Sequence, residues 1–212
     1  LSGFRILVTA GPTHEALDPV RYITNPSSGK MGYAVACAAR DRGAAVTLVS
    51  GPTRLPVPDG VHFMPCRKAI EMNDLVHRQF PDCDVLVMSA AVGDFAPMQI
   101  EKEKIKKKGS TPLVLELVPT EDILQNVVKL KTRQFVVGFA AESENLTQSA
   151  LEKLHNKKLD LIVANDISTP GIGFQSDSNL VTLINKHEKV EKLPLLSKIE
   201  IAHHLLNEVL AS

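Results

Sequence analysis

The chain has 212 residues, of which 44% are hydrophobic and 23% charged, and 24 basic and 24 acidic side chains give it a formal net charge of zero. A chain of this length can bury one good core, so we expect a single domain over residues 1–212. The balanced charge argues against a dedicated nucleic-acid binder, which normally carries a basic excess. Its apolar runs are too short to span a bilayer, so we expect no membrane segment.

The cysteines Cys37, Cys66 and Cys83 are odd in number and match no metal or redox spacing. Disulfides persist in oxidising compartments and are rare in the cytosol. We therefore expect reduced thiols and a cytoplasmic location. Cys37 lies among alanines on an expected core helix, where a small buried side chain is a better interpretation than a nucleophile.

Apolar runs typical of buried parallel strands alternate with helical patterns along most of the chain. The expected strands are 6–9, 46–50, 85–89, 135–139 and 161–164, and the expected helices are 31–42, 69–80, 122–131 and 147–157. This alternation predicts an α/β fold, a Rossmann-like doubly wound parallel sheet flanked by helices. Residues 180–184 and 190–193 predict a C-terminal antiparallel hairpin, and a helix is expected over 198–210.

The first expected strand runs into Gly11, and residues 25–32 lead into an alanine-rich helix. A strand, a small-residue loop and a helix N-terminus together can hold a phosphate, because backbone N–H groups point outward and the helix dipole favours negative charge. Neither familiar nucleotide motif is present. The dinucleotide fingerprint lacks two of its glycines after the strand, and Thr24 and Met31 occupy positions where a P-loop needs glycine and Ser or Thr. Plain turns remain the alternative interpretation.

Ligands of a doubly wound sheet bind outside the carboxyl ends of its strands. Small residues precede Asp94 and Asp166 at two of these expected ends. Alanine and glycine there leave room for a flat ring or a close backbone contact, and Asp94 can hold a metal ion or hydroxyl groups. For each aspartate taken alone, a helix cap or an Asx turn is an equally good interpretation.

Residues 100–110 break the alternation, because they contain five lysines and only two glutamates. Their low apolar content predicts a surface loop, and we expect a flexible flap over about residues 96–111. Ammonium groups on such a flap can neutralise a triphosphate and close over it. A solvated charge run and a nucleic-acid patch are the alternatives.

Eight motifs follow one another along the chain: TAGPT (9–13), DPVRYITNPSSGKMG (18–32), VTLVSGPT (46–53), AAVGDF (90–95), EKIKK (103–107), GFAAE (138–142), LDLIVAND (159–166) and GFQSDSN (173–179). Together they resemble phosphopantothenoylcysteine synthetase, the ligase of coenzyme A biosynthesis, in its bacterial CTP-using form. The resemblance covers nearly the whole chain in family order. It implies a Rossmann-like fold and a homodimer with active sites shared at the interface. It also implies that the domain is often fused to a flavin-dependent decarboxylase domain.

The reaction that the resemblance implies joins 4′-phosphopantothenate and L-cysteine with CTP as co-substrate and Mg²⁺ as cofactor. The carboxylate attacks the α-phosphate of CTP, pyrophosphate leaves and an acyl-cytidylate remains. The amine of cysteine then attacks the acyl carbon, giving the amide and CMP. A carboxylate is a poor acyl donor because its leaving group is oxide, so the mixed anhydride supplies a better one.

The resemblance also assigns roles by motif position. Asn25 and Lys104 match catalytic positions: the Asn25 amide would orient or stabilise the acyl oxygen, and Lys104 on the flap would contact the triphosphate. The expected substrate-binding residues are Arg21, Asn25, Ser27, Ser28, Gly29 and Ala91. The expected CTP-binding residues are Met88, Ser89, Ala90, Asp94, Lys104, Asp122, Ile123, Phe139, Lys153 and Lys157, with Asp94 also the candidate metal ligand.

One departure and two rival classes stay open. The family often has Asn-Pro before Asp122, where this chain has Thr120 and Glu121, so contacts from these two residues are in doubt. An NAD(P)-dependent reductase would need the three-glycine fingerprint and an acidic residue after the second strand, where Ser50 stands. A non-catalytic nucleotide-binding module would not need both a phosphate loop and a lysine flap. The choice of CTP over ATP rests on the resemblance alone.

Overall fold

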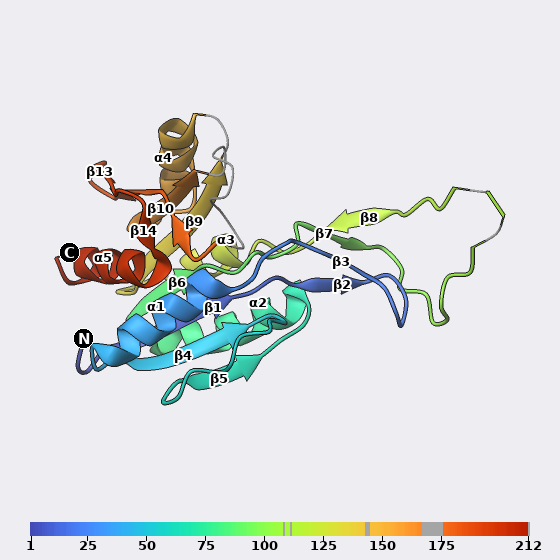
Figure 1. Cartoon of the computed structure of the whole chain (residues 1–212), viewed down its shortest axis with the longest axis horizontal. Helices are drawn as coiled ribbons and strands as arrows, with labels where there is room; N and C mark the ends of the chain where they lie inside the picture. The colour runs from blue at the N-terminus through green and yellow to red at the C-terminus, as the bar shows by residue number, and fades with distance from the viewer. Residues whose placement is uncertain (108, 111, 143–144, 167–175, 212) are drawn as a thin grey trace.

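The structure is a computed structural model that describes residues 1–107, 109–110, 112–142, 145–166 and 176–211. An eight-stranded sheet lies at its centre, in the order β13-β12-β10-β9-β6-β1-β4-β5 (Figure 1). Its strands are β1 (Arg5–Ala10), β4 (Ala45–Ser50), β5 (His62–Pro65), β6 (Val85–Met88), β9 (Phe135–Glu142), β10 (Leu161–Asp166), β12 (Val181–Asn185) and β13 (Val190–Lys192). In this sheet the six neighbouring strands β10, β9, β6, β1, β4 and β5 run parallel to one another. The strand β12 is antiparallel to β10, and β13 is antiparallel to β12.

Counted along the chain, the parallel strands follow the order 3-2-1-4-5-6 of dinucleotide-binding sheets. The predicted α/β class, the parallel sheet and the C-terminal antiparallel hairpin are therefore confirmed. The strand order reverses between β1 and β6, so the sheet has its topological switch point at their carboxyl ends.

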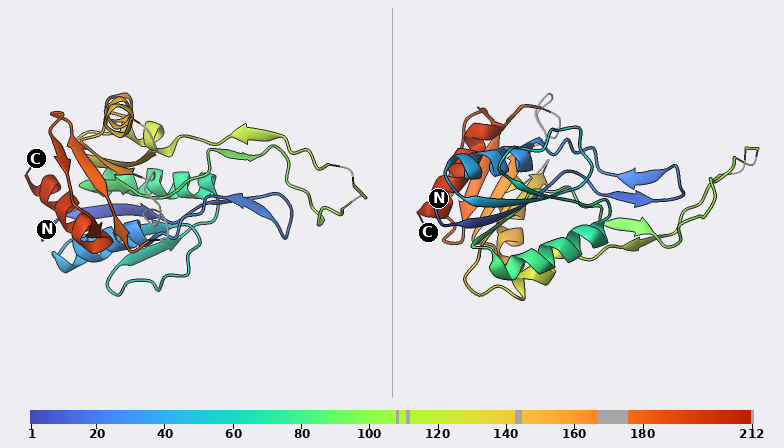
Figure 2. Two further views of the ribbon diagram at one scale, coloured as in Figure 1. Left: turned by 45° about the horizontal axis from the view of Figure 1, so that its top comes forward. Right: turned by 90° about the horizontal axis from the view of Figure 1, so that it is seen from below.

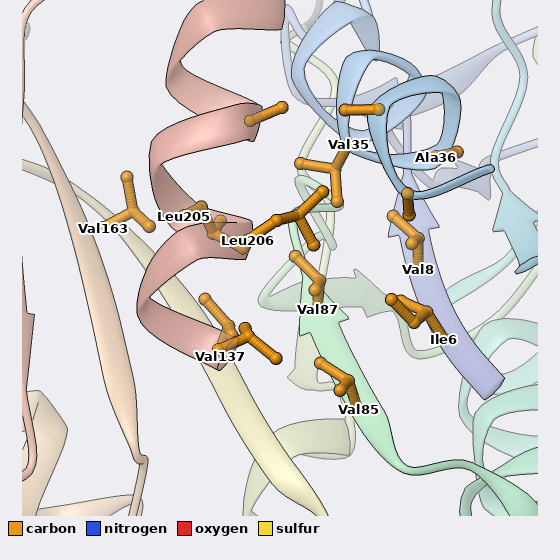
Figure 3. Packing of buried hydrophobic residues seen from close by; sticks show 14 of the residues in the cluster. Ile6, Val8, Val35, Ala36, Val85, Val87, Val137, Val163, Leu205 and Leu206 are labelled. Carbon is orange, nitrogen blue, oxygen red and sulfur yellow. The ribbon is translucent and has the colours of Figure 1, made fainter. Parts of the chain in front are cut away.

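Helices cover both faces of the sheet. The helices α1 (Lys30–Asp41) and α5 (Lys198–Leu210) pack on one face, and α2 (Ala69–Gln79), α3 (Ile123–Val128) and α4 (Leu146–Asn156) pack on the other. Figure 3 shows the first core, where Val8 and Val87 of neighbouring strands lie beneath Val35 of α1 and Leu206 of α5. Alternate side chains of each strand enter opposite cores, which explains the nearly continuous apolar runs. None of the described helices is long and apolar enough to cross a membrane.

The predicted element bounds differ from the structure where the sequence has weak periodicity. The helix α3 ends at Val128 rather than Lys131, and Asp122 is its N-cap, with Oδ1 accepting a hydrogen bond from the N–H of Gln125 at 2.8 Å. Strand β5 was not predicted. Three short antiparallel pairs were also missed: β2 (His14–Ala16) with β3 (Tyr22–Thr24), β7 (Phe95–Pro97) with β8 (Leu117–Pro119), and β11 (Ser178–Asn179) with β14 (Leu196–Ser197).

Two of these pairs project away from the sheet (Figures 1 and 2). We call residues 14–24, which contain β2 and β3, the hairpin, and residues 95–119, which contain β7 and β8, the arm. The predicted flap at about 96–111 is part of this arm and has a paired base, so it is not simply a free loop. Residues 108 and 111 of that prediction lie outside the described residues.

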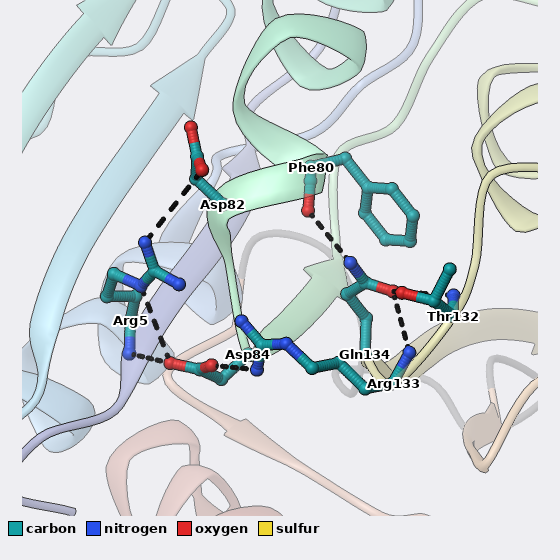
Figure 4. Close-up of polar contacts among 7 residues, drawn as sticks. All are labelled: Arg5, Phe80, Asp82, Asp84, Thr132, Arg133 and Gln134. Carbon is teal, nitrogen blue, oxygen red and sulfur yellow. Dashed lines mark hydrogen bonds and ion pairs between the residues drawn. The ribbon is translucent and has the colours of Figure 1, made fainter.

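The amino edge of the sheet is closed by ionic contacts around Asp84 (Figure 4). Oδ2 of Asp84 accepts a hydrogen bond from the N–H of Arg5 at 2.7 Å, and Oδ1 pairs with Arg133. The bond from Arg133 is the largest cause that holds the pKa of Asp84 below its usual range. These contacts tie β1, β6 and β9 together at the edge opposite the expected ligand site.

Candidate active site

The carboxyl ends of β6, β9 and β10 and the start of α1 open into a pocket of about 600 Å³. The pocket lies at the switch point between β1 and β6, where sheets of this topology bind ligands. Its walls come from residues between 25 and 31 at the start of α1, from residues between 88 and 94 at the end of β6, and from residues 120–124 around the start of α3. The end of β9, one side of α4, Asn165 of β10, Asn179 of β11 and Lys198 of α5 also contribute to the wall.

All predicted binding residues except Arg21 and Lys104 line this pocket. The substrate set contributes Asn25, Ser27, Ser28, Gly29 and Ala91, and the CTP set contributes Met88, Ser89, Ala90, Asp94, Asp122, Ile123, Phe139, Lys153 and Lys157. Arg21 lies on the hairpin and Lys104 on the arm, and neither is among the described residues that line the pocket. The fold therefore brings two separately predicted sets together, while the individual roles stay predictions.

Backbone packs directly on backbone where α1 begins. A Cβ at Gly32 would lie 2.6 Å from Cβ of Ala10, and a Cβ at Gly29, whose φ is +78°, would lie 2.7 Å from Cγ2 of Thr53. The helix N-terminus is thus pressed onto the end of β1, beside the pocket. The Thr53 methyl group occupies space next to Gly29 and Gly11 at the place where a dinucleotide would need open backbone. With buried Ser50 at the end of β4, this packing argues against an NAD(P)-dependent reductase.

The amide of Asn25 has a defined direction. Nδ2 donates hydrogen bonds to the carbonyl oxygens of Ala91 at 3.3 Å and Val92 at 3.0 Å. Two carbonyl acceptors require the NH₂ end of the amide on that side. Among the described residues, no donor contacts Oδ1 of Asn25. This oxygen can therefore accept a hydrogen bond from a ligand in the pocket. The expected role in stabilising the acyl oxygen would need the NH₂ end instead, and that end is already bonded.

Lys153 of α4 and Lys157, which directly follows α4, both line the pocket, as their spacing of four residues predicts. Nζ of Lys153 donates to the carbonyl oxygen of Phe139 at 2.8 Å, and Nζ of Lys157 pairs with Asp122. Burial alone would raise the pKa of Asp122, but Lys157 and the N–H of Gln125 outweigh it and hold the pKa below its usual range. A bound triphosphate would compete with Asp122 for the Lys157 ammonium group.

Thr120 and Glu121, which depart from the family pattern, both line the pocket and also brace it. Oγ1 of Thr120 donates to the carbonyl oxygen of Gly93 at 2.6 Å. Oε2 of Glu121 accepts a hydrogen bond from Nδ2 of Asn73 at 3.1 Å, which links α3 to α2. Both residues of the departure therefore help to hold this wall of the pocket in place.

Lys30 and Lys198, which had no predicted role, form a basic side of the pocket. Nζ of Lys30 is 2.6 Å from Oδ1 of Asp177, and Nζ of Lys198 donates to the carbonyl oxygen of Ser176. Burial, with a smaller contribution from Lys30, lowers the pKa of Lys198 to about 8. Strand directions could have revealed Lys198: β12 and β13 carry the chain away from the carboxyl edge and back, so α5 must begin there.

Asn165 at the end of β10 is a further pocket residue to which the sequence analysis gave no role. Its residue surface is only 7% exposed, and its Oδ1 has no hydrogen-bond partner among the described residues. A buried amide oxygen without a partner is costly, so this atom is suited to a ligand donor or a bound water.

Comparison with known proteins agrees with this geometry. The family profile described as DNA/pantothenate metabolism flavoprotein C-terminal domain matches residues 1–212. The chain belongs to this family. It is 43% identical over 212 residues to the coenzyme A biosynthesis bifunctional protein CoaBC of Bacillus subtilis (strain 168), covering 100% of this chain and 52% of the relative.

The protein of the same name from Vibrio cholerae serotype O1 is 47% identical over 213 residues, covering 98% of this chain and 53% of the relative. The chain thus spans about half the length of these curated relatives. Among solved structures, the crystal structure of the C-terminal domain of CoaBC superimposes with a TM-score of 0.85 at 41% identity, covering 99% of this chain and 95% of that one.

Proposed function

We propose that this chain ligates 4′-phosphopantothenate and L-cysteine with CTP, releasing pyrophosphate and CMP and forming 4′-phosphopantothenoyl-L-cysteine. One observation carries the proposal: the residues expected to hold the acyl substrate and those expected to hold the nucleotide line the same pocket. Membership of a family whose relatives are coenzyme A biosynthesis proteins supports the same reaction.

In the first step, a carboxylate oxygen of phosphopantothenate attacks the α-phosphorus of CTP and the bond to the β-phosphate oxygen breaks. Negative charge develops on the leaving pyrophosphate, and the ammonium groups of Lys153 and Lys157 can stabilise it from the α4 side. In the second step, the cysteine amine attacks the acyl carbon, CMP leaves with the electron pair of the C–O bond, and the amine loses a proton.

The direction of the Asn25 amide supports a role in the second step. Because its NH₂ group is bonded to Ala91 and Val92, the available Oδ1 accepts a hydrogen bond and can orient the N–H of the attacking cysteine amine. This role differs from stabilisation of the acyl oxygen. It makes Asn25 a group that selects and aims the nucleophile.

Mg²⁺ is proposed as the cofactor, since it neutralises the triphosphate charge when bound. No group of three or more potential metal-ligating side chains occurs among the described residues. Mg²⁺, however, commonly uses one or two carboxylates together with substrate phosphates. Asp122 is engaged with Lys157 and Glu121 with Asn73, so the exposed carboxylate of Asp94 is best suited to this ion.

A homodimer with shared sites is proposed from the surface of the arm. Large apolar side chains are exposed along it, namely Phe95, Met98, Ile100, Leu113, Val114, Leu115, Leu117 and Val118, and Val114 is 87% exposed. A larger exposed apolar patch commonly marks a protein interface, and exposed apolar side chains recur along this arm. A second copy is the best occupant, because Arg21 and Lys104 lie away from the pocket of their own chain and can reach a pocket of the partner.

We further propose that a flavin-dependent decarboxylase domain is fused to this domain in the full-length protein, since the matched relatives are bifunctional and about twice as long. Cytoplasmic location and the absence of a nucleic-acid partner stay predictions from the sequence.

The reaction is tested by incubating the protein with CTP, Mg²⁺, 4′-phosphopantothenate and cysteine and measuring pyrophosphate and CMP. Pyrophosphate should appear without cysteine, whereas CMP should require cysteine. ATP in place of CTP is the nucleotide control. A folded protein that releases no pyrophosphate from either nucleotide would contradict the proposal.

A further inference from the structure

The two predicted site residues outside the pocket are joined to each other by a residue that has no assigned role. Arg21 lies on the hairpin and Lys104 on the arm, and the carboxylate of Asp18 lies between the two segments. The side chain of Asp18 is completely buried, which is unusual for an aspartate and calls for several compensating bonds.

The two oxygens of Asp18 serve different segments. Oδ1 accepts hydrogen bonds from the N–H groups of Val20 and Arg21, both at 2.7 Å, and so fixes the turn of the hairpin. Oδ2 accepts a hydrogen bond from the N–H of Ile105 at 3.0 Å and lies 3.8 Å from Nη1 of Arg21. One oxygen thus builds the turn, and the other holds the arm.

The hairpin also donates to the arm and accepts from it at neighbouring positions. Nη2 of Arg21 donates to the carbonyl oxygen of Ile105 at 2.9 Å, and the N–H of Glu101 donates to the carbonyl oxygen of Leu17 at 2.9 Å. Both polar backbone groups of Ile105 are therefore bonded to the hairpin. The N–H of Ile105 belongs to the peptide unit that Lys104 begins, so these bonds fix the backbone next to Lys104.

The charge on Asp18 is retained in this setting. Burial alone would raise its pKa, but the N–H bonds from Ile105, Val20 and Arg21, together with the guanidinium group, hold the pKa below its usual range. The carboxylate therefore stays ionised at neutral pH and keeps accepting all these bonds.

We propose that Asp18 is a positioning residue that holds Arg21 and Lys104 as one unit for the ligation reaction. This inference rests on the proposed function, from which the two cations take their roles. An exposed lysine on an otherwise unsupported arm would have to be ordered each time CTP is bound, whereas the Asp18 contacts order its backbone in advance.

The variant Asp18→Asn separates the two functions of the carboxylate. Its Oδ1 can still accept from Val20 and Arg21 and keep the turn, while its Nδ2 faces the N–H of Ile105 and the guanidinium of Arg21, both donors. We expect pyrophosphate release to fall roughly 10-fold to 100-fold, because catalytic groups misplaced by about 1 Å lose rate on this scale. The amide of Ile105 should exchange its hydrogen faster than in the wild-type protein.

Glu103→Gln is the matched control, since it removes a carboxylate from an exposed position two residues from Ile105. It should stay within about twofold of the wild-type rate, as expected for an exposed charge. A double-mutant cycle shows whether the effect of Asp18→Asn depends on Lys104, which a general loss of stability would not produce. In a Lys104→Gln background, Asp18→Asn should slow pyrophosphate release by less than about twofold, because the ammonium group that Asp18 positions is already absent.

Full activity of Asp18→Asn in a protein whose wild-type form is active overturns the positioning role, and so do independent, additive losses in the cycle. A wild-type protein that releases no pyrophosphate refutes the proposed function itself and the inference with it. If Asp18→Asn does not fold, Ile105→Pro is the second variant. It removes the backbone N–H that donates to Asp18 and must show the same loss of rate.

Discussion

The pocket and the arm are two regions that carry predicted site residues in different ways. The pocket is held by the sheet, by helices on both faces and by backbone contacts such as Gly32 on Ala10. The arm projects from the sheet (Figure 2). It is tied to the hairpin through hydrogen bonds to Ile105 from Asp18 and Arg21. This difference supports the proposal that one chain contributes a pocket to a shared site and that the arm contributes to the pocket of a neighbouring chain.

The largest expected effect distinguishes the two regions, because the arm should act in the first reaction step and Asn25 in the pocket should act in the second. Lys104→Gln on the arm should lower pyrophosphate release roughly 100-fold to 1000-fold, the scale seen when a group that stabilises developing charge is removed. Asn25→Asp in the pocket should still release pyrophosphate but accumulate acyl-cytidylate, because its second oxygen would meet the carbonyls of Ala91 and Val92. Single-turnover assays that follow both products test this. Equal loss of both steps in the two variants would contradict the division of roles.

The next effect concerns the pH dependence of the free energy of unfolding. It should come from Lys198 in the pocket wall and not from residues of the arm. The pKa of Lys198 is about 8 in the folded protein and about 10.4 when unfolded. Between these values the unfolded chain holds the proton and the folded chain does not, so stability rises as the pH increases from about 8 to about 10.4. Relative to Lys198→Met, the free energy of unfolding should rise on the order of 3 kcal/mol across this window.

Denaturant titrations at several pH values measure this difference. Lys192→Met, which removes an exposed lysine on β13, is the control and should parallel the wild-type protein. If the free energy of unfolding changes with pH in the same way for Lys198→Met and the wild-type protein, burial of the charged Lys198 does not lower the stability of the folded state.

A third effect should appear in assembly and leave the fold intact. Met98→Glu places a charge on the exposed apolar surface of the arm and should weaken dimerisation roughly 100-fold, as for loss of a strong interface contact. Ile70→Glu changes an equally exposed apolar residue on α2 and should leave dimerisation unchanged. Sedimentation equilibrium distinguishes these outcomes. Equal dimer dissociation constants for the two variants would mean that the arm is not part of the dimer interface.

The smallest effect concerns nucleotide affinity in the pocket. Lys157→Met should raise the Kd of CTP roughly 10-fold, because one charge-assisted contact to phosphate is lost. Lys129→Met, at the end of α3 and outside the pocket lining, should leave the Kd unchanged. Calorimetric titration with CTP measures both. An unchanged Kd in Lys157→Met would mean that Asp122 keeps this lysine from the triphosphate.

The parts of the fold that the sequence predicted are those with strong hydrophobic patterns. Strands such as β1 and β6 are apolar over most of their length, and α5 has a clear start at the capping box formed by Ser197 and Glu200. The sheet order then follows from short right-handed connections, so residues at the strand ends converge on one pocket.

The parts that were missed have no local pattern. Strands β2, β3, β7 and β8 have three residues each, which is too short for a period to appear. The hydrogen bonds that join Asp18 and Arg21 to Ile105 span 87 and 84 residues of sequence. Nothing near Asp18 in the chain indicates that partner. Lys198 was missed because its place depends on two antiparallel strands that turn the chain back to the carboxyl edge.

The central claim is that the pocket of one chain and the arm and hairpin of another form one active site. The most direct test is a heterodimer of Asn25→Asp and Arg21→Ala subunits, purified through two different tags. If Arg21 acts on the partner's pocket, one of the two sites contains only wild-type groups. The heterodimer should then form 4′-phosphopantothenoyl-L-cysteine at about half of the wild-type rate, while each variant homodimer forms this product at below about 1% of that rate. A heterodimer no more active than its parents would contradict the shared site.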